Sequence, residues 1–277
     1  MNNKYMLSFF KKLLPKFEAL ESTVSIIIQG PLHSRSIESI ESYLRYGEVI
    51  VSCWDTDNLR MLEKYNDRIK IVVNKYSDIG DHYRLRGSQA PWVYQNYTTL
   101  NGLKEASGYF SIKFRSDESY PIIDPIINKL NKIHHEQKNP KTNDYDHHKL
   151  LTSNIYFRRD NENKFHPSDH IVAGTTPRMI SVYEKAYSIS KIGTGDQRFP
   201  EQVLCKAAIE SRRIKGKGFF RKDRFDTMRE QDSKDQMKEY FDIIRICELP
   251  NHIWTSSYRR YDALYSEEDW CHDINSI

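Results

Sequence analysis

The sequence predicts an α/β fold with a Rossmann-type, mixed but mainly parallel sheet flanked by helices. Two observations lead to this prediction. Short apolar runs rich in β-branched residues alternate with segments of helical periodicity over residues 24–114, and each run ends in polar, glycine or proline residues. Strands that alternate with helices pair in parallel through right-handed crossovers. Such a sheet binds its ligands at the carboxyl ends of its strands.

The first half of the chain is expected to contain strands and helices in strict alternation. The strands are expected at residues 24–28, 48–54, 69–74 and 109–114. The helices are expected at residues 36–46, 58–65 and 92–106. The run Val24-Ser25-Ile26-Ile27-Ile28 is typical of a strand that is buried on both faces. Gly47 and Gly108 follow the first and third helices and predict where these helices end.

Composition indicates a globular protein and excludes several classes. The chain has 277 residues, of which 38% are apolar, so it is long enough to bury a substantial core. Its 42 basic and 38 acidic residues give a net charge of +4. This is mild for a dedicated nucleic-acid binder, whose isoelectric point usually exceeds about 9. The cysteines form neither a CxxC pair nor a zinc-site spacing, so we expect reduced thiols: Cys53, Cys205, Cys247 and Cys271.

Residues 1–22 are expected to form an amphipathic N-terminal segment, because apolar side chains recur there at intervals of three and four residues with lysines between them. A helix on an anionic membrane surface and a terminal helix packed on the domain both fit this pattern. No run reaches the roughly 18 apolar residues of a membrane span, and the first 20 residues lack the features of a secretory signal. We therefore expect a cytoplasmic protein, with peripheral contact to the inner face of the cytoplasmic membrane as the functional interpretation of this segment.

Polar clusters follow three of the expected strands. Gln29-Gly30-Pro31 follows the first strand, Asp55-Thr56-Asp57-Asn58 the second, and Asn74 ends the third. Because the carboxyl ends of parallel strands share one edge of a sheet, we expect these clusters to converge. Asp55 and Asp57 suit a ribose hydroxyl or a base edge. The alternative is that they cap the following helix.

The segment Arg115-Ser116-Asp117-Glu118 follows the fourth strand at the same edge. The carboxylates of Asp117 and Glu118 suit Mg²⁺ or Mn²⁺. The guanidinium groups of Arg84, Arg86 and Arg115 suit phosphate oxygens. A solvated turn is the alternative for the acidic pair. Four successive strand ends with ligand-capable groups favour a nucleoside-diphosphate site, toward which Asn96 in the helix at 92–106 is also expected to point.

Five stretches in this half carry a resemblance to a known family: VSIIIQGP, VIVSCWDTDN, NKYSDIG, QNYTTLNGLKEASGYF and IKFRSDE. Their order and spacing are similar to the nucleotide-sugar half of glycosyltransferases with the GT-A fold. More narrowly, residues 24–120 resemble the WavE group of lipopolysaccharide and capsule glycosyltransferases, and the likeness continues weakly through HPSDHIVAGT and FPEQVLCKAAI. The resemblance implies a GT-A-like fold and transfer of a sugar from a nucleotide-sugar donor to a bacterial surface glycan or lipid-linked acceptor.

The resemblance also implies how the single domain is divided, with a nucleotide-sugar-binding half at residues 23–120 and an acceptor-binding half at residues 121–277. In the family, an acidic DxD corner binds the metal and the diphosphate, and Asp117 matches its last carboxylate. Asp55 and Asp57 match the acidic turn that holds the nucleoside, and Gln29 and Gly30 belong to the donor-binding set.

One position departs from the family pattern, because Arg115 stands where the first Asp often lies. If the cofactor is Mn²⁺ or Mg²⁺, Glu118 is the substitute carboxylate and His252 in ELPNHIW is the candidate third ligand. If Arg115 neutralises the donor phosphate directly, the enzyme has no metal cofactor.

The second half is less regular, and it should supply the catalytic base. Inverting sugar transfer needs a carboxylate or histidine that takes the proton of the attacking hydroxyl. The candidates are Glu201 in RFPEQ and Asp169 with His170 in HPSDH. Glu201 after Pro200 also fits ordinary helix-start chemistry. Residues 134–149 hold two His-His pairs, for which a solvated loop is expected over a metal site.

Residues 211–225 concentrate seven Lys and Arg residues beside three phenylalanines. Such a stretch suits nucleic acid, a diphosphate-linked lipid, or a loop that folds over the donor. The amphipathic N-terminal segment favours the lipid or phosphate interpretation, so nucleic acid is not an expected partner and a nucleic-acid-binding module is an alternative function. A nucleotidyltransferase that makes activated sugars is another. Its usual Gly-rich basic loop for a triphosphate does not match Gln29-Gly30-Pro31-Leu32-His33.

Overall fold

A sheet of seven strands forms the centre of the computed structural model, which describes residues 23–80, 90–137, 148–155, 165–192, 200–211, 235 and 237–253. The strand order is β3-β2-β1-β4-β6-β5-β7. The strands are β1 (Val24–Gln29), β2 (Glu48–Trp54), β3 (Lys70–Asn74), β4 (Phe110–Arg115), β5 (Leu150–Ser153), β6 (Ile171–Thr175) and β7 (Phe241–Ile244). Every neighbouring pair is parallel except the two that involve β6, which runs antiparallel to β4 and β5.

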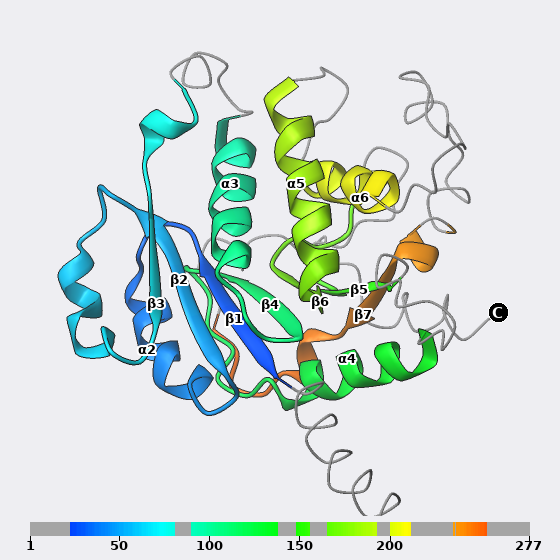
Figure 1. Ribbon diagram of the computed structural model, residues 1–277. Coiled ribbons are helices and arrows are strands. Elements are labelled where there is room, and N and C mark those ends of the chain that lie inside the picture. Colours follow the sequence, from blue (N-terminus) through cyan, green and yellow to red (C-terminus); the bar gives the residue numbers. More distant parts are fainter. Residues whose placement is uncertain are drawn as a thin grey trace, which may run out of the picture.

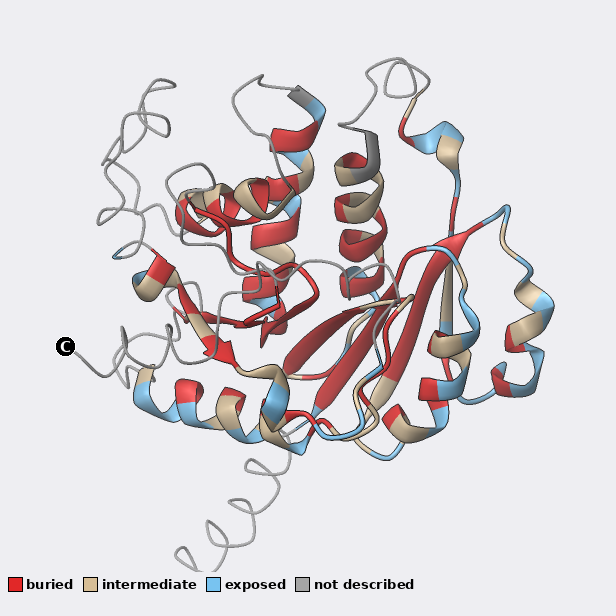
Figure 2. Cartoon of the chain, turned by 180° about the vertical axis from the view of Figure 1, so that it is seen from behind, coloured by how far each residue is buried: buried red, intermediate tan, exposed pale blue. Residues whose placement is uncertain are grey.

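Helices cover both faces of the sheet (Figure 1). One face carries α2 (Ser34–Tyr43) and α4 (Asp124–Gln137), and the other carries α3 (Ala90–Lys104), α5 (Thr176–Ile192) and α6 (Pro200–Ser211). Successive residues of β1 serve the two faces in turn, as the pleat requires. Ile26 and Ile28 pack in the core under α2 and α4, whereas Ile27 packs in the core under α3, α5 and α6. The central strands are therefore buried on both faces, as Figure 2 shows.

The predicted α/β fold with a mixed, mainly parallel sheet is confirmed. The four expected strands appear as β1 to β4, and the expected helices at 36–46 and 92–106 appear as α2 and α3. The segment expected to be helical at 58–65 forms a 3₁₀ helix, η1 (Leu59–Tyr65). Two shorter 3₁₀ turns are η2 (Tyr76–Asp78) and η5 (Ile246–Glu248). The second half is more regular than expected, since it adds β5, β6, β7 and the helices α4 to α6.

The expected solvated loop at residues 134–149 is wrong for His134 and His148, which are 3% and 4% exposed. His134 lies in α4, and its Nδ1 atom is 3.1 Å from the hydroxyl oxygen of Tyr109. Its ring contacts that of His148 edge to face, with centroids 5.3 Å apart. These polar rings are buried because aromatic and hydroxyl partners replace water around them.

Several predictions concern residues outside the described ranges. The amphipathic segment at 1–22, Arg84, Arg86 and all but the first residue of the basic stretch at 211–225 belong to this group. Within the ranges that are described, none of the helices has the length and apolarity that crossing a bilayer requires.

Candidate functional site

A pocket of about 530 Å³ lies at the carboxyl edge of β1 to β4. Its wall is formed by residues 29–33 after β1, by Trp54 at the end of β2, and by Tyr76 after β3. Residues 115–117 after β4 complete it, together with two side chains of α3, Tyr94 and Gln95. The clusters that follow the first and fourth strands therefore converge on one pocket.

The floor of the pocket is a close contact between the turns after β1 and β4. The backbone N–H of Ser116 donates to the carbonyl oxygen of Gln29 at 2.9 Å. Gly30 has a φ of +122°, and a Cβ atom at this position would lie 2.7 Å from the Oγ atom of Ser116. Only glycine satisfies both the backbone conformation and this separation.

The side of the pocket that belongs to β2 and β3 is aromatic. The rings of Trp54 and Tyr76 stack with centroids 4.0 Å apart and an interplanar angle of 8°. Tyr94 from α3 meets both rings edge-on, at 5.6 and 5.3 Å. Trp54 is 2% exposed and forms the buried end of this stack. Stacked and edge-on rings of this kind provide a rigid apolar surface for a planar ligand.

The side of the pocket that belongs to β4 is charged. The Nε and Nη2 atoms of Arg115 donate to the two carboxylate oxygens of Asp117, at 3.0 and 2.9 Å. Each of these side chains is 27% exposed. Burial alone would raise the pKa of Asp117, but the guanidinium of Arg115 holds it below its usual value. Arg35 from the first turn of α2 reaches the backbone carbonyl of Asp117 at 3.4 Å.

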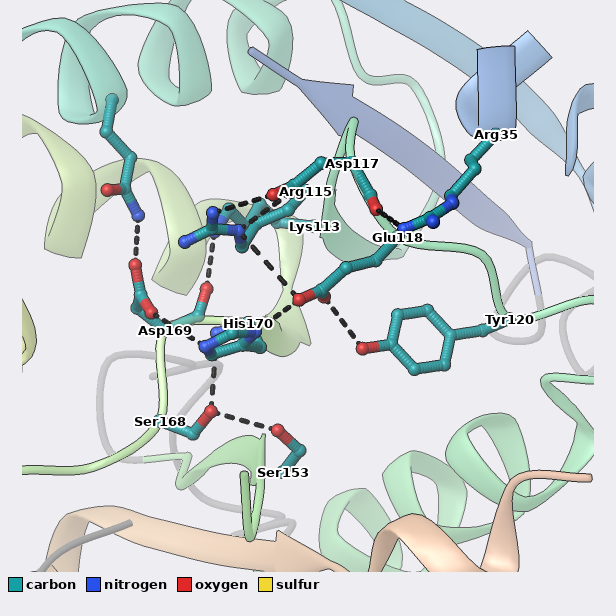
Figure 3. A network of polar contacts seen from close by, with 11 residues as sticks. Arg35, Lys113, Arg115, Asp117, Glu118, Tyr120, Ser153, Ser168, Asp169 and His170 are labelled. Carbon is teal, nitrogen blue, oxygen red and sulfur yellow. Dashed lines mark hydrogen bonds and ion pairs between the residues drawn. The ribbon is translucent and has the colours of Figure 1, made fainter. Parts of the chain in front are cut away.

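Glu118, the next residue, is buried and does not line the pocket, and its carboxylate is directed toward Tyr120 and His170 (Figure 3). Its Oε2 atom accepts a hydrogen bond from the hydroxyl of Tyr120 at 2.7 Å. Its Oε1 atom contacts Nδ1 of His170 and lies 3.9 Å from Nε of Arg115. Glu118 therefore connects the pocket arginine to a histidine of the second half.

Asp169 is the second buried carboxylate of this network. Its Oδ2 atom accepts from Nε2 of the pocket residue Gln95, and its backbone oxygen accepts from Nζ of Lys113. Burial alone would raise the pKa of Asp169, but the charges of Lys113, His170 and Arg115 lower it overall. Burial lowers the pKa of Lys113, which is fully enclosed within β4, and the carboxylate of Asp169 opposes that effect.

The structure divides the predicted site residues into three groups. Those that line the pocket are Gln29, Gly30, Arg115 and Asp117. Those in the buried network behind it are Glu118, Asp169 and His170. Those that lie in described ranges but not in the pocket wall are Asp55, Asp57, Asn96, Glu201 and His252.

Most members of the last group have partners elsewhere in the fold. Asp57 accepts the backbone N–H of Trp54 through Oδ2 at 2.9 Å, whereas Asp55 is exposed. The alternative of a helix cap does not describe this turn, because the N-cap of η1 is Asn58 and it makes no side-chain cap bond. The side-chain amide of Asn96 donates to Ser190 at 2.8 Å and ties α3 to α5.

Glu201 and His252 also have partners outside the pocket wall. Glu201 lies in the first turn of α6, and its Oε2 atom is 3.4 Å from Nε2 of the buried His166. The Nδ1 atom of His252 is 2.8 Å from the carbonyl oxygen of Leu249. The next residue, Ile253, pairs with Ser119, so His252 reaches the neighbourhood of the turn after β4 without lining the pocket.

Sequence reasoning missed several functional candidates: His33, Trp54, Tyr76, Tyr94, Gln95 and Lys113. The aromatic residues resemble core residues in a single sequence. For Gln95, the sequence offers one signal. Neighbouring side chains of a helix point about 100° apart around its axis, so Gln95 and Asn96 in α3 do not face the same side. The inward-facing positions of α3 therefore decide which of the two amides reaches the pocket.

The family becomes clear from the sequence match. Residues 24–249 match the model of the family described as WavE lipopolysaccharide synthesis. The chain belongs to the WavE family. The match covers the pocket, the buried network and all seven strands of this WavE protein.

Other comparisons are more distant. No curated protein sequence matches this WavE chain significantly. Among solved structures, it is similar to the apo-form glycosyltransferase GlyE of Streptococcus pneumoniae TIGR4, with a TM-score of 0.41 and 8% sequence identity. That similarity covers 69% of the WavE chain and 44% of GlyE, so the WavE chain spans less than half of the other protein. A likeness this distant does not bear on function.

Proposed function

We propose that this WavE protein is a glycosyltransferase with a GT-A type donor site. It would move a sugar from a nucleotide-sugar donor to a lipopolysaccharide or capsule glycan or to a lipid-linked acceptor. The observation that carries the proposal is the composition of the pocket. An aromatic stack and an arginine–aspartate pair face the same space across the ends of β3, β2, β1 and β4.

The strand order supports one orientation of the donor. Tyr76 follows β3 and Arg115 ends β4, three strand spacings away, which corresponds to roughly 14 Å. The base is proposed to stack beside Tyr76 and Trp54, since aromatic faces accept any base. The phosphates are proposed to lie near Arg115 and the N-terminus of α2, whose dipole favours anions.

Each group of this site has a proposed task during transfer. As the bond between the sugar and the leaving phosphate breaks, negative charge grows on that phosphate, and the guanidinium of Arg115 would stabilise it. Asp117 would position Arg115. Asp169 contacts Gln95 and His170 contacts Glu118, so we assign Asp169 and His170 the positioning of these two side chains. Glu201 stays the predicted base that removes the proton of the acceptor hydroxyl.

The two alternative functions, a nucleic-acid-binding module and a nucleotidyltransferase, have less support than the transferase. The nucleic-acid module depends on residues 211–225, nearly all of which lie outside the described ranges. The nucleotidyltransferase requires a triphosphate loop after β1, and that position holds the turn Gln29-Gly30-Pro31. Cytoplasmic location and peripheral membrane contact accompany the transferase proposal as predictions about the N-terminal segment.

A nucleotide screen tests the proposed function. The melting temperature of the purified full chain is measured with UDP-, GDP-, CMP- and dTDP-sugars, each with EDTA and with Mn²⁺. A nucleotide that binds the folded state raises the melting temperature, and the rise grows with the logarithm of the nucleotide concentration divided by its dissociation constant. We expect one base to be preferred, and Glu201→Gln to keep this shift while losing sugar transfer. If every nucleotide-sugar leaves the melting temperature unchanged in both conditions, the chain does not bind a nucleotide-sugar donor and the proposed function is wrong.

A further inference from the structure

We infer that Arg115 takes the place of a divalent cation at this site, so that the donor phosphates are bound by a guanidinium and nucleotide binding does not need a metal. The inference rests on the proposed function, because it concerns how the same pocket holds its donor. It departs from the two-carboxylate metal site that the family pattern implies.

The acidic residues of the turn do not fit a metal in the pocket. Both carboxylate oxygens of Asp117 already accept hydrogen bonds from Arg115. The side chain of Glu118 is fully buried, and its two oxygens contact Tyr120 and His170. To reach a cation in the pocket, Glu118 would have to leave both partners and carry its charge past Arg115.

Among the residues that the structure describes, no third ligand compensates for this arrangement. Within the described ranges, no group of three His, Cys, Asp or Glu side chains is arranged to hold a metal ion. His252, the predicted third ligand, is hydrogen-bonded through Nδ1 to the backbone of Leu249 and is absent from the pocket wall. A fixed positive charge at Arg115 also repels a divalent cation from the position where Asp117 would coordinate it.

The same contacts prepare Arg115 for phosphate. Its side chain lines the pocket. The guanidinium is held by Asp117, with Nη2 2.9 Å from Oδ2, and by Glu118, with Nε 3.9 Å from Oε1. A guanidinium is planar, stays charged at any physiological pH and pairs with phosphate oxygens through two nitrogens. Because the side chain is already held in place, little conformational entropy is lost when a phosphate binds. Burial lowers the pKa of Arg115 and the nearby carboxylates raise it, and the carboxylates prevail.

The effect of Asp117→Asn on nucleotide affinity has opposite directions in a metal site and in the arrangement inferred here. In a metal site, Asp117→Asn removes a ligand and weakens nucleotide binding. In the arrangement inferred here, Asp117 is a positioning residue whose negative charge opposes the phosphates and neutralises part of Arg115. Asparagine can still accept one hydrogen bond from Arg115 through Oδ1. We therefore expect Asp117→Asn to bind a nucleoside diphosphate at least about threefold more tightly than the parent.

The experiment measures dissociation constants of UDP, GDP, CDP and dTDP by isothermal titration calorimetry, with EDTA and with Mn²⁺. For the preferred nucleotide, we expect the two constants to agree within about twofold, a difference of less than 0.5 kcal/mol. Arg115→Gln should weaken binding at least about tenfold, as expected for loss of a charged hydrogen-bond donor. Arg68→Gln is the matched control, because Arg68 makes the same two-nitrogen contact with Glu41 on the surface.

The outcomes separate the inference from the proposed function. Nucleotide binding that appears only with Mn²⁺ and is lost in Asp117→Asn would overturn the inference and leave the transferase intact. No binding of any nucleotide in either condition would overturn the proposed function itself. If Arg115→Gln does not fold, as judged by circular dichroism, Arg115→Lys and the parent titrated with EDTA decide the question. Binding by the parent in EDTA supports the inference, and binding only with Mn²⁺ refutes it.

Discussion

Arg115 and Asp117 meet through two hydrogen bonds of 3.0 and 2.9 Å, one to each oxygen of the carboxylate. The next residue in the chain, Glu118, sends its carboxylate to the other side of the turn, against Tyr120 and His170. These two adjacent acidic residues therefore have different surroundings and different roles. Asp117 faces the pocket, and Glu118 belongs to the interior.

Asp117 should make part of the stability depend on acidity. Its pKa in the folded protein is lowered, whereas the unfolded chain has an aspartate pKa of about 3.9. A carboxyl of this kind contributes stability above about pH 5 and loses that contribution as the pH falls through its folded pKa. We expect the melting temperature of Asp117→Asn to fall less than that of the parent between pH 5 and pH 3. The exposed carboxylate of Asp55, changed to Asn, is the control, and parallel curves for parent and Asp117→Asn would contradict the prediction.

Glu118 should matter for folding more than for nucleotide binding. Glu118→Ala leaves Tyr120 and His170 without their shared partner in the interior, and we expect it to reduce the free energy of unfolding by about 3–5 kcal/mol. Glu118→Gln keeps the shape and one acceptor, so the expected loss is about 1–3 kcal/mol. Urea unfolding measures both. A Glu118→Gln protein of normal stability that no longer binds nucleotide would mean that Glu118 contacts the ligand.

Gln95 and Asn96 should separate binding from stability. Both side chains donate a hydrogen bond to a buried partner, Asp169 and Ser190 respectively, so Gln95→Ala and Asn96→Ala should each cost about 1–3 kcal/mol. Only Gln95 lines the pocket. We therefore expect Gln95→Ala alone to weaken nucleotide binding when both variants are titrated well below their melting temperatures. An equal loss of affinity in Asn96→Ala would restore Asn96 as a donor-binding residue.

Tyr76 should contribute to the affinity for the base. Removing an aromatic stacking partner usually costs about 1–3 kcal/mol, which is roughly a 5- to 150-fold loss of affinity. We expect this loss in Tyr76→Ala for nucleotides but not for inorganic pyrophosphate, which has no base. Tyr97→Ala is the matched control, because Tyr97 pairs with Tyr187 outside the pocket wall. Equal losses in the two tyrosine variants would place the base elsewhere.

Gly30→Ala should destabilise the protein for two separable reasons. A φ of +122° is strained for any residue with a side chain, at a cost of about 1–3 kcal/mol. In addition, the new Cβ would approach the hydroxyl of Ser116. Adding Ser116→Ala should relieve the second effect and leave the first, so the double variant should recover part of the lost stability in urea. Full recovery would mean that the backbone at residue 30 can relax.

Most of the first half could be predicted because its signals are local. The run from Val24 to Ile28 is too apolar for a solvated segment. Gly47 and Gly108 indicated that a helix precedes each of them, but the two helices end earlier than predicted, at Tyr43 and Lys104. The second half was harder because β5 and β7 have only four residues each, too few for a clear period. β6 pairs with strands that are distant in sequence, and a single sequence gives no sign of such partners.

The residues of the site could likewise be predicted only in part. A strand end predicts which edge a residue occupies, and this placed Gln29, Gly30, Arg115 and Asp117 at the pocket. It does not predict which way each side chain turns. Glu118 follows Asp117 directly yet points inward, because Tyr120 and His170 offer hydrogen bonds that only the folded chain brings together. The burial of Lys113 was likewise hidden, since its partner is a backbone oxygen 56 residues away.

The reversed direction of β6 has a consequence for how the chain can be divided. β4, which ends in Arg115, pairs with β1 on one side and with β6 on the other. Its two neighbours therefore come from different halves of the chain. A fragment that stops near residue 120 would expose one whole edge of β4, and open strand edges promote aggregation. We therefore expect each piece to be insoluble when it is produced alone, so the two halves of the chain are not separate folding units.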